Sequence, residues 1–168
     1  MTLVGKKAPD FVLEGVQNNE ITDFQFEGEG SRGTWRILFF YPRSFTGVCE
    51  SEIKGFAKEY ERFKKLGFEL FAISTDSPFV HRAWLQKDIP DLKFPLLADT
   101  RHDVSASYGI LADNGAALRA TFIIDPKGIV VHESVNFFPV GRSTEEIYRL
   151  ACAFKSGGSC SLDWKPPS

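Results

Sequence analysis

One seven-residue segment constrains the fold of this chain more than any other feature. From Trp35 to Tyr41 every residue except Arg36 is apolar, and Pro42 follows directly. A run that is this short and almost uninterrupted is typical of a strand that other elements cover on both faces. The segment therefore predicts a strand at the centre of a sheet.

The periodicity of the sequence changes after this segment. From Glu50 to about Leu66 the apolar residues recur every three or four positions, with Glu and Lys between them. This spacing is typical of an amphipathic helix. Gly67 stands where a glycine commonly ends a helix. The apolar positions are Ile53, Phe56, Ala57, Tyr60, Phe63 and Leu66.

The remaining segments alternate between the same two patterns. Further strands are predicted at 11–13, 21–26, 68–74, 94–98, 120–124 and 129–133, and further helices at 77–87, 104–108 and 143–156. The strands 120–124 and 129–133 flank Asp125-Pro126-Lys127-Gly128, which has the residues of a tight turn, so they form a hairpin.

This order of elements predicts the fold class. A β-rich start precedes a β-α-β-α-β series, a hairpin and a last helix, which implies a mixed central sheet with helices on both faces. The small α/β architecture that fits is the thioredoxin-like fold with an N-terminal β extension. The length of 168 residues suits one domain. We expect that domain to span 1–156 and a C-terminal tail to span 157–168.

Charge and hydropathy exclude several classes of protein. The chain has 20 Lys and Arg against 22 Asp and Glu, a net charge of −2. Nucleic acids and anionic membranes attract basic surfaces, so neither is an expected partner. No apolar run approaches the roughly 20 residues of a membrane span, and Met1–Lys7 lacks the apolar core of a secretory signal. We therefore expect a cytoplasmic protein.

The cysteines and histidines give no sign of a disulfide framework or a metal site. The cysteine count is odd and Cys-x-x-Cys is absent. The histidines are scattered without the spacing of metal ligands. The cysteines are therefore either inert buried thiols or reactive ones. The residues concerned are Cys49, Cys152, Cys160, His81, His102 and His132.

Cys49 has the position of a reactive thiol. It lies between the predicted central strand and the predicted long helix. The free N–H groups and the positive dipole end of that helix would face its sulfur and favour the thiolate. The loop 42–48 can fold back over the sulfur, and Thr46 could offer its hydroxyl to the thiolate or to a substrate. By position alone, a buried structural cysteine fits equally well.

The residues around Cys49 resemble a known active site. Pro42, Thr46 and Cys49 match the peroxiredoxin pattern Pro-x-x-x-Thr-x-x-Cys. The resemblance continues in order along nearly the whole chain, and it is to the typical 2-Cys type, the alkyl hydroperoxide reductase C and thiol-specific antioxidant family, whose fold is thioredoxin-like. The further landmarks are Glu52, Trp84, 94–99, 119–126 and 140–142.

The resemblance implies a role for each matched residue. Cys49 would be the peroxidatic cysteine, which attacks the terminal peroxide oxygen and becomes a sulfenic acid. Arg119 would stabilise the thiolate and bind the peroxide oxygens with its donor fork. Thr46 would donate a hydrogen bond to the peroxide, and Pro42 would shield the sulfenate from water.

A supporting group and one departure accompany these residues. Glu52 and Arg142 would form a polar group that orients Arg119. Without the resemblance, Arg119 and Arg142 would be surface cations beside a strand and a helix. Glu50 stands where the family usually has proline. A carboxylate there suits a helix N-terminus but opposes a thiolate, so it leaves the reactivity of Cys49 open.

The C-terminal segment is similar to the resolving segment of the family. Cys160 lies in Gly-Gly-Ser-Cys-Ser-Leu-Asp-Trp-Lys-Pro, with Ser159 and Ser161 in place of the usual Val and Pro. The resemblance implies that Cys160 is the resolving thiol, which attacks the Cys49 sulfenate of a partner subunit. Cys152 is expected to be a small apolar residue at the edge of the core.

The implied reaction cycle needs no metal, flavin or haem. Hydrogen peroxide or an organic hydroperoxide would be reduced to water or an alcohol, and an external thioredoxin-like protein or flavoprotein disulfide reductase would reduce the disulfide. The implied assembly is a homodimer that exchanges tails, with dimers often forming a ring of five, a decamer. The segments 129–131 and 136–139 could supply the dimer contact, and Phe45 and Phe79 the ring contact; burial in the core is the alternative for each.

Two other functions remain compatible with the sequence. One is a 1-Cys peroxiredoxin in which Cys160 plays no part. The other is a thiol-based peroxide sensor or holdase with little turnover. A thioredoxin-type disulfide reductase is disfavoured because Cys-x-x-Cys is absent.

Overall fold

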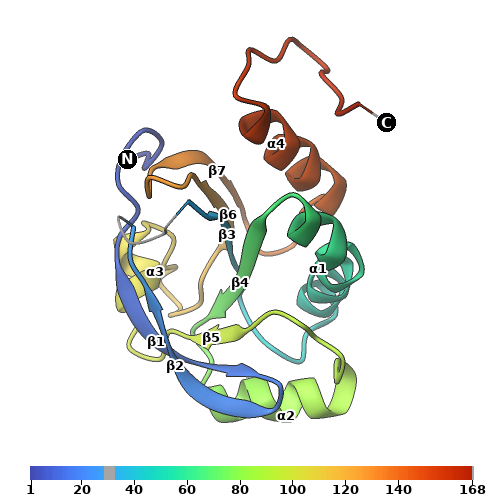
Figure 1. Ribbon diagram of the computed structural model, residues 1–168. Coiled ribbons are helices and arrows are strands. Elements are labelled where there is room, and N and C mark those ends of the chain that lie inside the picture. The colour runs from blue at the N-terminus through green and yellow to red at the C-terminus, as the bar shows by residue number, and fades with distance from the viewer. Residues whose placement is uncertain (29–32, 168) are drawn as a thin grey trace.

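The computed structural model describes residues 1–28 and 33–167, which contain a seven-stranded sheet with helices packed on both sides (Figure 1). The strands are β1 (Phe11–Gln17), β2 (Glu20–Phe26), β3 (Trp35–Phe40), β4 (Phe68–Ser74), β5 (Leu96–Ala98), β6 (Arg119–Ile124) and β7 (Val130–Asn136). The helices are α1 (Gly47–Lys65), α2 (Pro78–Asp88), α3 (Asp103–Ser107) and α4 (Thr144–Ser156).

The sheet is mixed, as the order of elements predicts. Its strand order is β2-β1-β5-β4-β3-β6-β7. β3 pairs in parallel with β4, and β4 with β5. On one side β6 pairs antiparallel with β3 and β7 with β6, and on the other side β1 pairs antiparallel with β5 and β2. This arrangement confirms the thioredoxin-like fold with its N-terminal β extension.

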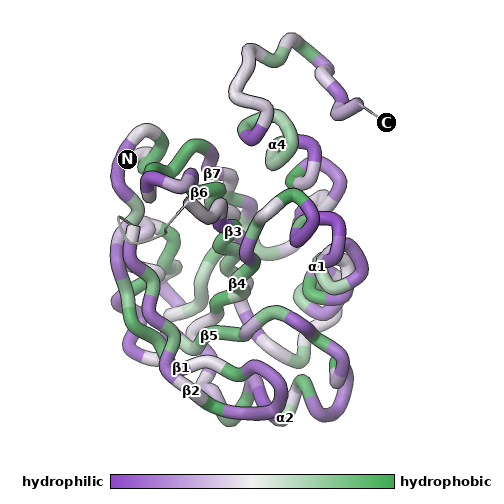
Figure 2. The backbone as a smooth tube through the Cα atoms, in the orientation of Figure 1, coloured by the Kyte–Doolittle hydropathy of each residue, from purple (hydrophilic) through white to green (hydrophobic). Residues whose placement is uncertain are grey.

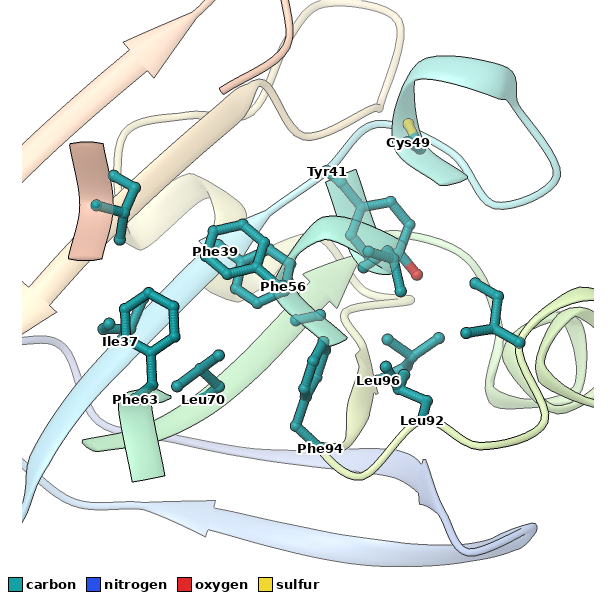
Figure 3. Packing of buried hydrophobic residues seen from close by; sticks show 14 of the residues in the cluster. Ile37, Phe39, Tyr41, Cys49, Phe56, Phe63, Leu70, Leu92, Phe94 and Leu96 are labelled. Atoms are coloured by element: carbon teal, nitrogen blue, oxygen red, sulfur yellow. The ribbon is translucent and has the colours of Figure 1, made fainter. Parts of the chain in front are cut away.

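The central strand β3 separates two hydrophobic cores, which explains its unbroken apolar sequence. Ile37 and Phe39 point to the face that α1, α2 and α4 cover, whereas Leu38 and Phe40 point to the face that carries α3. On the first face Phe39 stacks on Phe56 of α1 with ring centroids 4.1 Å apart (Figure 3). In Figure 2 the central strands β4 and β5 are mainly hydrophobic, while polar residues follow the outer surface of α1.

The predicted helix boundaries are confirmed at three places. Gly67 follows α1 with a φ of 81°, a conformation that favours glycine. The Ser77 hydroxyl caps α2 by accepting a hydrogen bond from the N–H of Val80 at 3.2 Å. The Ser143 hydroxyl caps α4 by accepting from the N–H of Glu146, also at 3.2 Å.

The start of α1 differs from the prediction. The helix begins at Gly47, so Cys49 lies inside its first turn and not just before it. Thr46 is the extended N-cap, and its carbonyl accepts the first helical hydrogen bond from the N–H of Glu50 at 2.9 Å. The exposed residues of this turn add nothing to the apolar periodicity, which begins at Ile53, so the pattern could not detect it.

The outer strands are longer than predicted because pairing partners extend them. β1 continues to Gln17, since it pairs with β2 along its whole length. Asn18 and Asn19 connect the two strands with positive φ values of 52° and 66°, as tight hairpin turns require. β7 continues to Asn136, which pairs with Arg119.

The segment after α4 leaves the body of the protein. Gly157 ends the helix with a φ of 70°, and residues 157–167 contain neither helix nor strand. In Figure 1 this tail extends from the end of α4 away from the sheet. Ser168 lies outside the described residues. In the described part of the chain, no helix is long and apolar enough to span a membrane.

Candidate active site

Cys49 is buried at the N-terminal end of α1, close to the carboxyl end of β3. Its relative exposure is 0%. The N–H groups of Gly47, Val48 and Cys49 precede the first helical hydrogen bond and therefore have no partner within the helix. These N–H groups and the helix dipole favour negative charge at this position.

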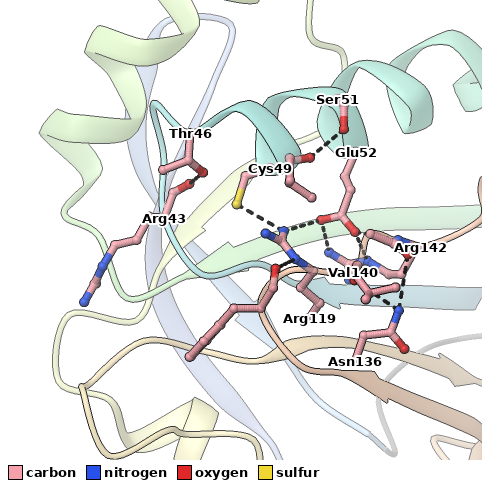
Figure 4. A network of polar contacts seen from close by, with 12 residues as sticks. Arg43, Thr46, Cys49, Ser51, Glu52, Arg119, Asn136, Val140 and Arg142 are labelled. Carbon is pink, nitrogen blue, oxygen red and sulfur yellow. Dashed lines mark hydrogen bonds and ion pairs between the residues drawn. The ribbon is translucent and has the colours of Figure 1, made fainter.

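Arg119, the first residue of β6, contacts the sulfur directly. Its Nη1 donates a hydrogen bond to Sγ of Cys49 at 3.2 Å and another to Oε2 of Glu52 at 2.9 Å (Figure 4). Its Nε donates to the carbonyl of Phe138 at 2.7 Å. The side chain is fixed from three directions and only 4% of the residue is exposed. Because the guanidinium is always charged, this contact places a fixed positive charge against the sulfur.

Glu52 binds a second guanidinium one turn of helix after the cysteine. Arg142 Nε and Nη2 donate to Oε1 and Oε2 of Glu52, both at 2.9 Å, and the Arg142 N–H donates to Oε1 at 2.8 Å. Arg142 Nη1 also donates to the carbonyl of Ala120 at 2.8 Å. This bidentate pair, which Figure 4 shows beside Arg119, is almost completely buried.

The charge of Glu52 is maintained despite its burial. Burial alone would raise the pKa of this carboxyl, but the hydrogen bonds and charge of Arg142, together with the charge of Arg119, outweigh it and lower the pKa. Two guanidinium groups and one carboxylate leave one positive charge beside Cys49. A thiolate would balance that charge, and buried charges are tolerated mainly when they are paired.

Pro42 and Thr46 lie in the loop that precedes Cys49. Pro42 is buried and Thr46 is exposed. The Thr46 hydroxyl donates to the carbonyl of Arg43 at 2.9 Å, so it stabilises the loop and does not donate to the sulfur (Figure 4). The structure thus brings Cys49 together with Arg119 and the Glu52–Arg142 pair, and directs the Thr46 hydroxyl elsewhere.

Glu50 has a partner of its own. Nζ of Lys54, one turn later on α1, lies 2.5 Å from Oε1 of Glu50. The ammonium group offsets the carboxylate that stands where the family usually has proline. The electrostatic opposition of Glu50 to a Cys49 thiolate is therefore weaker than the sequence alone suggests.

Cys160 lies in a very different environment. It is exposed in the tail, and its sulfur is 3.9 Å from the carbonyl oxygens of Ala153 and Gly158. Ala153 is near the C-terminal end of α4, whereas Arg142 precedes its N-terminal end. A 13-residue helix is about 20 Å long. All three cysteines are free, and the sulfurs of Cys49 and Cys160 in one chain are not within disulfide distance.

The segments expected at subunit contacts are partly exposed. Phe45 and Phe79 are 47% and 65% exposed, so they are not core residues. β7 is an edge strand of the sheet, and Val135 and Phe137 at its end are exposed. Val130, by contrast, is completely buried.

Sequence reasoning missed two groups that hold the site together. The carbonyl of Phe138 accepts a hydrogen bond from Arg119, but a backbone acceptor has no signature in the residue types. The carboxylate of Asp76 accepts one from the N–H of Ser44 in the loop before Cys49. An acidic residue two positions after the predicted strand 68–74 was the available signal for Asp76. Among the described residues no cluster of His, Cys, Asp and Glu could hold a metal ion.

Comparisons with known proteins cover nearly the whole chain. The model of the AhpC/TSA family matches residues 4–133. Peroxiredoxin-2 of Cricetulus griseus is 42% identical over 98% of this chain and 87% of its own length. Thioredoxin peroxidase of Echinococcus granulosus is 41% identical over 99% of this chain and 90% of its own length.

A solved structure has the same fold. The reduced 2-Cys peroxiredoxin of Plasmodium vivax superposes with a TM-score of 0.93 at 34% identity, covering 98% of this chain and 90% of its own. Both kinds of comparison extend beyond the segment around Cys49, so the similarity concerns the complete domain and not one short motif.

Proposed function

Because this chain belongs to the AhpC/TSA family, it is an enzyme of the peroxiredoxin type, a thiol-dependent peroxidase, and we propose that Cys49 is the residue that reacts with the peroxide. The single observation that carries this proposal is the 3.2 Å contact between Arg119 Nη1 and the Cys49 sulfur inside a buried cluster of charges. No other cysteine in the described residues has a buried guanidinium as a hydrogen-bond donor.

The chemical step follows from this arrangement. The Cys49 thiolate attacks the terminal oxygen of a hydroperoxide, the O–O bond breaks, and the leaving oxygen takes a proton and departs as water or an alcohol. Cys49 becomes a sulfenic acid. Arg119 stabilises the negative charge as it moves from sulfur to the leaving oxygen. Hydrogen peroxide and small organic hydroperoxides are the proposed substrates, since the sulfur is completely buried.

The remaining residues of the site support this step. Glu52 and Arg142 hold the guanidinium of Arg119 in place, and their buried ion pair prevents it from turning away. Pro42, buried at the start of the loop, keeps water from the sulfenic acid. Thr46 stabilises the loop, and its hydroxyl turns toward the peroxide when substrate binds.

Cys160 is the proposed resolving thiol, and it acts on a partner subunit. Its sulfur attacks the sulfenic sulfur of Cys49, a disulfide forms and water leaves. The supporting observation is the position of Cys160 in an exposed tail at the C-terminal end of α4. The Glu52–Arg142 pair lies near the opposite end of that helix. A tail from a second subunit, free of that constraint, can approach the site.

The proposed enzyme also needs an electron donor and assembles into oligomers. An external dithiol, from a thioredoxin-like protein or a flavoprotein disulfide reductase, returns the disulfide to two thiols. The similarity to the thioredoxin peroxidase of Echinococcus granulosus favours the thioredoxin-like donor. The subunits form homodimers through the exposed end of β7 near Val135 and Phe137, and dimers associate into a decamer through Phe45 and Phe79. Sedimentation tests the assembly, and a monomer at micromolar concentration would contradict it.

Turnover with each substitution tests the peroxidase assignment. Peroxide consumption coupled to NADPH through thioredoxin and its reductase should disappear in Cys49→Ser and persist in Cys152→Ser, the matched control. The same assay with a flavoprotein disulfide reductase identifies the better donor. Activity that survives in Cys49→Ser would refute the assignment of the reactive cysteine.

Non-reducing electrophoresis with peptide mass spectrometry tests the disulfide. One equivalent of peroxide should give a disulfide-linked dimer that contains Cys49 joined to Cys160, absent in Cys160→Ser and present in Cys152→Ser. A monomer with a Cys49 sulfenic acid would indicate a 1-Cys enzyme. Rapid oxidation without recycling, with persistent disulfides to other proteins, would indicate a sensor.

A further inference from the structure

Because Cys49 is buried, its sulfur must become exposed before it can form a disulfide. Its exposure is 0%, yet a disulfide needs two sulfurs about 2.05 Å apart. No second sulfur can come so close unless the active-site loop, residues 42–46, or the first turn of α1 moves. The contacts that hold this loop therefore control when Cys49 becomes accessible.

Asp76, which follows β4, makes the shortest polar contact between this loop and the body of the protein. Its Oδ2 accepts a hydrogen bond from the N–H of Ser44 at 2.7 Å and one from the Ser74 hydroxyl at 3.1 Å. Nη1 of Arg43 lies 3.9 Å from Oδ1. The Asp76 side chain is only 15% exposed. A hydrogen bond from a backbone N–H to a largely buried carboxylate is strong, because the acceptor is charged.

A buried hydrogen-bonded chain fixes the Asp76 carboxylate in turn. The Ser74 hydroxyl donates to Asp76 and lies 2.7 Å from Nε2 of His81 on α2. The N–H of Asp76 also donates to the Ser74 hydroxyl oxygen at 3.2 Å. Ser74 and His81 are completely buried. Asp76 is thereby tied to both β4 and α2.

The other contacts of the loop are longer. The hydroxyls of Tyr41 and Ser44 are 3.3 Å apart. Arg43 donates to the Thr75 hydroxyl at 3.2 Å and to the carbonyl of Asn114 at 3.5 Å, with its own side chain 45% exposed. The ring of Phe45 is 6.1 Å from that of Trp84. Asp76 is the contact whose loss should loosen the loop most.

We propose that Asp76 is a positioning residue that holds the active-site loop closed over Cys49 and so sets the balance between reaction with peroxide and exposure of the sulfur. This inference rests on the proposed role of Cys49. With the loop closed, Cys49 and Arg119 keep the geometry that the peroxide step needs. With the loop open, the sulfur becomes accessible to a second thiol.

Alkylation of Cys49 tests the proposal without Cys160. In a Cys152→Ser, Cys160→Ser background, a bulky maleimide reaches Cys49 only when the loop opens, whereas methyl methanethiosulfonate is small. Asp76→Ala should raise the maleimide rate about tenfold or more relative to the small reagent. Asp76→Asn, which keeps one acceptor oxygen, should give a smaller increase. Asp91→Ala, at an exposed carboxylate, is the matched control and should change neither rate.

Two outcomes of this experiment would overturn the proposal. One is an unchanged maleimide rate in Asp76→Ala. The other is an equal rise with both reagents, which would mean that the thiol has become more reactive and not more exposed. If Asp76→Ala does not fold, as judged by circular dichroism, Asp76→Asn decides by the same criteria.

Stopped-flow tryptophan fluorescence on the full chain gives the second measurement. Asp76→Ala should slow the reaction of Cys49 with hydrogen peroxide about tenfold and speed the later disulfide step several-fold. An equal loss in both steps would contradict a positioning role. If the parent chain forms no disulfide between Cys49 and Cys160, the proposed resolving function fails, but the alkylation result still decides the role of Asp76.

Discussion

The surroundings of Cys49 and those of Cys160 differ in every physical respect. Cys49 is completely buried, touches a guanidinium and lies beside a carboxylate that binds two arginines. Cys160 is exposed, and its polar contacts are 3.9 Å long. The proposed attack of Cys49 on a peroxide would pass through a charged transition state, which groups fixed in advance stabilise. The proposed action of Cys160 on another subunit would require weak contacts that release easily.

The largest effect is expected when the carboxylate at the centre of the buried cluster is removed. Glu52→Gln leaves two buried guanidinium groups without their carboxylate, and breaking a buried ion pair in this way costs about 3–5 kcal/mol. Urea unfolding followed by circular dichroism measures the loss. Glu61→Gln is the matched control, because that carboxylate pairs with Lys93 on the surface and its loss should not move the midpoint detectably. Equal midpoints for the two variants would contradict this account.

A change at Arg119 should lower the rate of the reaction with peroxide more than it lowers stability. Arg119→Lys keeps a positive charge but loses the fork that joins Cys49, Glu52 and the Phe138 carbonyl. The second-order rate with hydrogen peroxide should fall about 100-fold, the usual loss for one preorganised donor. Stopped-flow fluorescence measures it, with Arg101→Lys as an exposed control. A fall of less than threefold would mean that charge alone suffices.

The contribution of Glu52 to stability should depend on pH. The folded pKa of Glu52 is lowered, so the unfolded chain binds its proton first as the pH falls. The stabilisation from Glu52 is complete above the unfolded pKa of about 4.3 and is lost as the pH falls through the lower folded value. The difference in unfolding free energy between the parent chain and Glu52→Gln should therefore stay constant above about pH 5.5 and shrink below pH 4. A difference that grows in acid would reverse the sign of the assignment.

The smallest effect is expected in the tail. Arg149 on α4 donates to the carbonyl of Trp164 at 3.2 Å and is otherwise bound to Glu146. Arg149→Gln should leave the unfolding free energy within about 0.5 kcal/mol of the parent value and make the tail a few times more sensitive to limited proteolysis. Arg101→Gln, at an exposed arginine, is the control. A large loss of global stability would show that the tail is part of the core. It would contradict the conclusion that the tail is held more weakly than the surroundings of Cys49.

The pattern of residue types determined the local elements and their approximate order. The apolar run at 35–41 specified a strand covered on both faces, because each of its faces meets a separate core. Ser77, Ser143 and Gly67 marked helix ends correctly, since capping depends on atoms within one turn. The resemblance to the peroxiredoxins added a predicted role for each residue of the candidate site.

Only the tertiary structure decided how distant groups meet. Arg119 is 67 residues from Glu52 and Arg142 is 90 residues from it, and no local periodicity acts over such separations. The strand order places β6 next to β3, and this pairing brings Arg119 to the start of α1. The start of α1 at Gly47, the direction of the Thr46 hydroxyl and the bond from Ser44 to Asp76 likewise depend on hydrogen bonds available only in the folded chain. Residue patterns report burial and turns, whereas the hydrogen-bond partners of a buried polar group are decided by which donors and acceptors the packed sheet and helices bring next to it.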